Sequence, residues 1–107
     1  MPGKAGVVIQ TVLFMIVLHF VEILMWAMAY LLVAAEELES VEAAIYFSAV
    51  TFTTLGYGDI TLSPTWRLLS GFEAIGGIVL IGWTAAMLYA MLQRMWQALT
   101  TTGGSHD

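Results

Sequence analysis

The sequence predicts an all-α membrane protein with two transmembrane helices and a shorter helix that re-enters between them. Of its 107 residues, 60% are hydrophobic and only 10% are charged. A soluble fold of this size cannot hide so much apolar surface. Two apolar runs are long enough to cross a bilayer, and a loop rich in Gly and Thr lies between them. Because no linker or internal repeat divides the chain, residues 1–107 are expected to form a single domain.

The first apolar run, residues 7–35, contains only Gln10, Thr11, His19 and Glu22 as polar or charged exceptions. At about 1.5 Å per residue, a helix of this length exceeds the roughly 30 Å hydrocarbon core of a bilayer. We therefore predict that the first transmembrane helix covers residues 7–35.

A shorter helix and a second span follow. Residues 36–40 interrupt the hydrophobicity, and Ser40 is a suitable N-cap for a helix over 41–53, which is too short to cross the membrane. Ser63 and Pro64 then predict the start of a second transmembrane helix over 64–99. Residues 100–107 are polar and are expected to form a flexible tail.

The charges predict an orientation and exclude several classes of protein. Lys4 and Arg94 flank the spans near the chain ends, whereas four glutamates and Arg67 lie between the spans. By the positive-inside rule, a multi-pass protein of the plasma or inner membrane would then have both termini in the cytoplasm. Three basic residues are too few for nucleic-acid binding. No serine or histidine has a catalytic partner at motif spacing, so we expect neither enzyme activity nor a cofactor.

The loop 54–59 combines glycine with polar backbone at membrane depth. Such backbone is tolerated there only where protein encloses it or where it lines a watery path. Successive carbonyls can face one axis only if the dihedral angles alternate between left- and right-handed regions, which Gly56 and Gly58 permit. Several copies around this axis would place rings of oxygen where a cation loses its hydration shell, so we expect a homotetramer or an equivalent assembly with closed rotational symmetry around a central pore. These oxygens belong to Thr54, Leu55, Gly56 and Tyr57, together with the Thr54 hydroxyl.

The run Thr54-Leu55-Gly56-Tyr57-Gly58-Asp59 resembles the selectivity-filter signature of potassium channels. The resemblance covers nearly the whole chain and is closest to the minimal two-transmembrane potassium channels of prokaryotes. It implies a potassium-selective pore whose filter faces the outside and binds K⁺ transiently at Thr54, Leu55, Gly56 and Tyr57, with Gly58 completing the filter. The alternatives are a weakly selective cation pore, a non-conducting membrane subunit, and an ordinary re-entrant turn.

The resemblance also implies residues that support the filter. Tyr46 and Phe47 match an aromatic pair that braces the filter in relatives. Because Phe47 cannot form a hydrogen bond, we expect Tyr46 to contact Asp59 and Thr51 to contact the Tyr57 hydroxyl. The alternative is that Tyr46 and Phe47 are simply core aromatics. Leu55 stands where relatives usually have Val or Ile. Val50 stands where some relatives have a glutamate, which pairs with the aspartate that corresponds to Asp59.

Some residues inside the spans need a special explanation. Gly77 falls where the resemblance places a gating hinge, although close helix packing would equally favour glycine. His19, Glu22 and Glu73 should face protein or water, because an ionised side chain in lipid costs at least about 2.5 kcal/mol. For the two carboxyl groups we consider a shared proton between them, hydrogen bonds from either to the short helix, or neutral acids satisfied locally.

Overall fold

The computed structural model describes residues 3–104, and the chain is helical over most of this range. Helix α1 (Lys4–Val33) is followed by the 3-10 turn η1 (Ala35–Glu37), the short helix α2 (Val41–Phe52) and the long helix α3 (Arg67–Gly104). No strand occurs between residues 3 and 104. The predicted all-α architecture of two long helices and one short helix is therefore confirmed.

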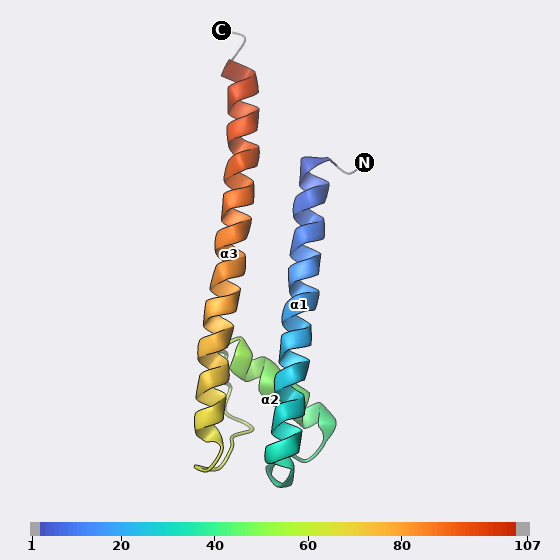
Figure 1. The fold of residues 1–107 in the computed structure, drawn as a ribbon, viewed down its shortest axis with the longest axis vertical. Helices are drawn as coiled ribbons and strands as arrows, with labels where there is room; N and C mark the ends of the chain where they lie inside the picture. The colour runs from blue at the N-terminus through green and yellow to red at the C-terminus, as the bar shows by residue number, and fades with distance from the viewer. Residues whose placement is uncertain (1–2, 105–107) are drawn as a thin grey trace.

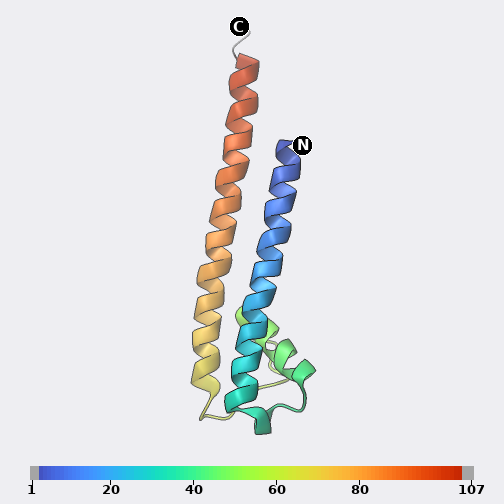
Figure 2. The same ribbon diagram turned by 45° about the vertical axis from the view of Figure 1, so that its right-hand side comes forward.

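The two long helices run side by side in opposite directions, and α2 crosses them near one end (Figures 1 and 2). Both ends of the described chain consequently lie at the opposite end of the molecule (Figure 1). By length and composition, Lys4–Val33 and Arg67–Thr100 can each cross a membrane, with mean hydropathies of 2.4 and 1.9 over their most apolar windows.

The core is confined to the end of the molecule that carries α2. Tyr30 of α1 and Ala44 of α2 are completely buried. Phe47 meets the Tyr30 ring edge to face, with ring centroids 5.2 Å apart. Along α3, by contrast, Glu73 and Gly77 are the only buried residues among those whose side-chain positions are described. The single chain therefore leaves most of its apolar surface without a protein partner.

Ser40 caps α2 as predicted, because its hydroxyl accepts a hydrogen bond from the Ala43 amide at 3.1 Å. The start of the second span is shifted: α3 begins at Arg67, three residues after Pro64. The reason is that Ser63 does not act as the N-cap. Its hydroxyl and its amide both donate to the Glu37 carboxylate, at 2.8 Å and 2.5 Å, and residues 64–66 form a turn.

The other helix ends differ from the predictions by a few residues. Helix α1 begins at Lys4 and ends at Val33, and α2 ends at Phe52. Helix α3 continues through Gly104, so residues 100–104 are helical instead of forming the expected tail. Residues 105–107 of that expected tail lie outside the described residues.

Candidate ion-conduction site

The end of α2 holds the start of loop 54–59 through short-range hydrogen bonds. The Thr53 hydroxyl donates to the Ala49 carbonyl at 2.8 Å. The Thr54 amide donates to the Thr51 carbonyl at 3.0 Å, and the Gly56 amide reaches back to the Val50 carbonyl at 3.1 Å. The loop therefore leaves the helix in a defined direction.

The backbone of loop 54–59 alternates in handedness. Positive φ angles occur at Thr54 (64°), Gly56 (58°) and Gly58 (92°), which are every second residue. The sequence predicted this conformation for the two glycines. Thr54 was missed, and it is the only residue other than glycine with a positive φ in the part of the chain that the structure describes. Continuing the alternation of positive and negative φ by one step before Gly56 would have identified Thr54, although a threonine side chain does not itself indicate a positive φ.

The loop lies away from the two long helices. Leu55 and Tyr57 are 70% and 69% exposed. A hollow of about 570 Å³ separates the loop from α2 and the start of α3. The single chain thus forms one open wall, and the space behind the loop is only partly filled. Residues lining this hollow include Tyr46, Phe47, Val50, Thr51, Gly56, Gly58 and Asp59.

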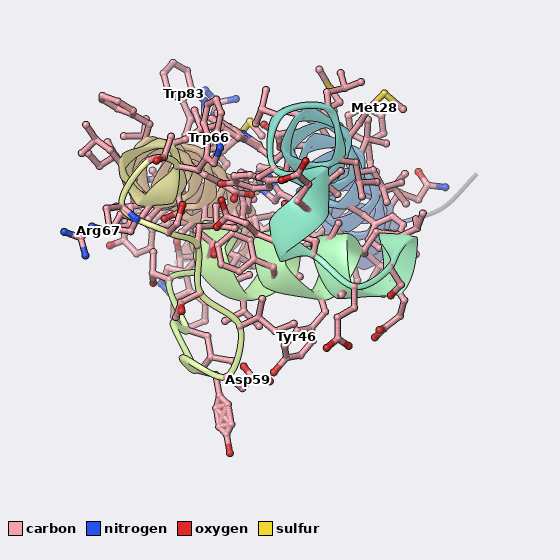
Figure 3. The ribbon with its side chains drawn as sticks, turned by 90° about the horizontal axis from the view of Figure 1, so that it is seen from below. Met28, Tyr46, Asp59, Trp66, Arg67 and Trp83 are labelled. Carbon is pink, nitrogen blue, oxygen red and sulfur yellow. The ribbon has the colours of Figure 1, made fainter. Side chains whose placement is uncertain are left out.

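Tyr46 and Asp59 lie close together on the side of α2 that faces away from the long helices (Figure 3). The hydrogen bond to Asp59 raises the pKa of the Tyr46 hydroxyl, with smaller contributions from desolvation and from nearby charge. This is the contact expected for Tyr46. Phe47, which is 6% exposed and packs on Tyr30, is a core aromatic.

The other expected supporting contact is not formed within one chain. No hydrogen bond joins the hydroxyls of Thr51 and Tyr57, and the Tyr57 side chain remains largely exposed. The Thr51 carbonyl instead accepts from the Thr54 amide. The bond predicted between Thr51 and Tyr57 is thus not formed within a single chain, and its formation in an assembly stays a prediction.

Charge is distributed unevenly along the molecule. At the α2 end, Glu37, Glu39 and Asp59 line one hollow of about 440 Å³. At the opposite end, Lys4 and Arg94 line one groove between α1 and α3. Cations approaching the loop end would consequently meet a negative potential. No group of three His, Cys, Asp or Glu side chains that could hold a metal ion occurs among the described residues.

Gly77 is a point of close contact between α3 and α2. A Cβ atom at this position would collide with the Phe52 carbonyl oxygen and would lie 2.7 Å from its carbonyl carbon. Helix α3 continues unbroken through Gly77. The packing explanation of this glycine therefore has a direct structural basis.

The polar residues inside the spans form two separate groups. His19 lies 2.7 Å from the Glu22 carboxylate and 2.8 Å from the Thr84 hydroxyl. Glu73 accepts a hydrogen bond from Tyr30 at 2.7 Å and lies 2.6 Å from Ser48 Oγ of α2. The prediction that Glu22 and Glu73 share a proton is therefore wrong, whereas the predicted hydrogen bond between Glu73 and the short helix is confirmed. Tyr30, Ser48 and Thr84 were not identified from the sequence, because no local pattern reports a contact across helices.

Comparison with protein-family models gave a match to the ion channel family over residues 7–94, from the first turn of α1 to the last turns of the apolar part of α3. The chain belongs to this ion channel family. It is accordingly a membrane protein with an ion-channel pore, and loop 54–59 lies inside the matched region. Comparisons with curated proteins and with solved structures gave no match.

Proposed function

We propose that four copies of this chain form a potassium-selective pore that conducts K⁺ passively through loop 54–59. The observation that carries the proposal is the positive φ at Thr54, Gly56 and Gly58 in a loop at the end of a re-entrant helix. Such alternation is what successive carbonyls require if they are to face one side of the loop, where they can replace the water around a cation. K⁺ would bind to the backbone oxygens of Thr54, Leu55, Gly56 and Tyr57, with Gly58 completing the filter.

The neighbouring residues would support this filter. Asp59 is held by Tyr46, and Phe47 anchors the same helix in the core. Thr51 lines the hollow behind the loop, where a contact with Tyr57 could form between neighbouring chains. The C-terminal end of α2, which carries the negative end of the helix dipole, would face the ion path below the filter.

The need for an assembly follows from the surface of the single chain. One loop supplies one wall, so rings of oxygen require a closed arrangement such as a homotetramer. The exposure of Leu55 and Tyr57 and the open hollow behind them agree with this requirement. Both termini would be cytoplasmic in the cell membrane, because Lys4 and Arg94 lie together at the end remote from the loop.

A flux assay with the purified protein tests the proposal. In liposomes that contain only this chain, we expect K⁺ flux that barium blocks and that Gly56→Ala abolishes while the tetramer remains intact. Alanine at a φ of 58° is strained regardless of the space around it. Gly82→Ala is the matched control, because apart from the adjoining backbone of its own helix no atom lies within 4 Å of a Cβ built there.

Reversal potentials in mixed K⁺ and Na⁺ would separate the remaining alternatives. A potential that follows the K⁺ gradient supports the potassium-selective pore. Similar permeability to both ions would identify a weakly selective cation pore. The complete absence of flux from correctly assembled protein would indicate a non-conducting subunit.

A further inference from the structure

Glu73 is a buried carboxyl group that lies outside the proposed conduction loop 54–59. Its side chain is completely buried, as are those of its two partners, Tyr30 and Ser48. The three residues come from α3, α1 and α2, so their hydrogen bonds join all three helices. Ser48 precedes Val50 on α2, and the Val50 carbonyl accepts a hydrogen bond from the Gly56 amide of loop 54–59.

The hydrogen bonds around Ser48 require one more proton than Ser48 itself carries. Its hydroxyl oxygen lies 2.8 Å from the Ile23 carbonyl oxygen and 2.6 Å from Glu73 Oε2. A serine hydroxyl has a single hydrogen to donate, and a carbonyl oxygen has none. Both contacts are hydrogen bonds only if Glu73 donates a proton to Ser48 while Ser48 donates to Ile23.

The other oxygen of Glu73 is consistent with this assignment. Tyr30 donates to Glu73 Oε1 at 2.7 Å, so this oxygen is the acceptor and Oε2 carries the proton. The resulting chain of donors runs from Tyr30 to Glu73, then to Ser48, and then to Ile23. Every buried side-chain nitrogen and oxygen in the described residues has a partner in this arrangement.

Within residues 3–104, no charged group lies where it would favour an ionised Glu73. On α1, the carboxylate of Glu22 is paired with His19. On α2, Tyr46 is bonded to Asp59, and Glu42 is exposed to solvent. A buried carboxylate without a cation would be expensive, whereas a neutral acid with all its hydrogen bonds is not.

We propose that Glu73 is a protonated positioning residue that fastens the short helix α2 to both spans and so fixes the loop 54–59 that α2 carries. Removal of this proton leaves two oxygens facing each other between Glu73 and Ser48 or between Ser48 and Ile23. One of the links that hold α2 is then lost. The functional consequence rests on the proposed function, because it assumes that loop 54–59 conducts. Alkaline pH is therefore expected to reduce conduction.

Infrared spectroscopy tests the protonation without relying on conduction. A protonated carboxylic acid gives a C=O stretching band that a carboxylate lacks. At neutral pH we expect this band in the wild type, its loss in Glu73→Gln, and its retention in Glu22→Gln, the matched carboxyl in the other polar group. Absence of the band from the wild type, or its persistence in Glu73→Gln, would overturn the proposal.

Conduction across pH tests the positioning role. Glutamine reproduces the neutral acid, since its oxygen can accept from Tyr30 and its amide can donate to Ser48. Wild-type flux should fall as rising pH removes this proton from the four chains, whereas Glu73→Gln should keep its neutral-pH flux across this range. The same alkaline fall in Glu73→Gln as in the wild type would contradict the role. A wild type that shows the infrared band but no flux would instead refute the proposed function.

Discussion

At the scale of single residues, loop 54–59 differs from an ordinary turn because a residue other than glycine adopts a strained, left-handed backbone conformation. Thr54 has a φ of 64° although it carries a side chain, and such a conformation costs of order 1–3 kcal/mol. The hydrogen bonds of Thr53, Thr54 and Gly56 to the last turn of α2 offset this cost. A loop that only connected two helices would not require a left-handed conformation at a threonine.

The hydrogen bond between Tyr46 and Asp59 leads to a prediction at the same scale. Because the pKa of Tyr46 is raised, the folded protein holds this proton more firmly than the unfolded chain does. The stabilisation is complete below the ordinary tyrosine pKa of about 10, and it is lost as the pH rises further. In a titration of tyrosinate absorbance, Tyr46→Phe should remove a group that ionises above the ordinary value. Loss of a normally titrating group instead would show that the bond is absent in solution.

At the scale of helices and turns, the closest approach between α2 and α3 depends on Gly77. In Gly77→Ala the added Cβ would press against the backbone of Phe52, which cannot move without displacing the start of loop 54–59. We expect a loss of about 1–3 kcal/mol, the usual cost of overpacking, measured as a lower thermal stability of the purified protein. The neighbouring Gly76→Ala is the control, since apart from the adjoining backbone of its own helix no atom lies within 4 Å of its Cβ position.

The same substitution separates packing from gating at Gly77. If Gly77 serves packing, the Gly77→Ala protein should be less stable than the wild type. If the protein kept its stability and only the opening of the channel changed, Gly77 would act as a hinge and not as a packing residue.

A second contact between elements involves η1 and the chain before α3. Glu37 accepts from both the amide and the hydroxyl of Ser63. Hydrogen bonds to a charged group are worth about 1.5–3 kcal/mol, so Glu37→Gln should destabilise this corner. Hydrogen exchange of the Ser63 amide should become faster, while the exposed Glu39→Gln should leave it unchanged. Equal exchange in all three proteins would mean that Glu37 does not hold the turn.

This contact also shows what the sequence could and could not predict. The long helices were predictable because hydrophobicity and length determine a transmembrane span. Ser40 caps its helix through a local bond, and it was predicted correctly. Ser63 was expected to do the same, but its hydroxyl donates instead to the carboxylate of Glu37, 26 residues away in the sequence. Glycine positions in the loop followed from backbone sterics, whereas the partners of Glu73 depend on how three helices pack.

At the scale of the whole molecule, the two ends and the two sides of the chain differ. Met28 and Trp83 project away from α2 on the side opposite Tyr46 and Asp59 (Figure 3), and they are 65% and 71% exposed. An apolar side suited to lipid and a loop side suited to other copies of the chain agree with the proposed assembly. Native mass spectrometry should therefore give a complex of four times the 11.7 kDa chain mass. A stable monomer or dimer in mild detergent would contradict the shared pore.

The acidic end of this assembly predicts how conduction depends on salt. Glu39 and Asp59 line one hollow beside the loop, and Glu42 is exposed in the first turn of α2. In a tetramer these carboxylates would surround the outer entrance and raise the local concentration of cations. Glu39→Gln combined with Glu42→Gln should reduce K⁺ conductance at low salt. The reduction should vanish near 1 M salt, where the screening length falls to about 3 Å from about 30 Å at 0.01 M. Lys4→Gln, at the other end of the molecule, is the control for a change of charge alone. An effect of the glutamate variants that persisted at high salt would reveal a structural role instead of an electrostatic one.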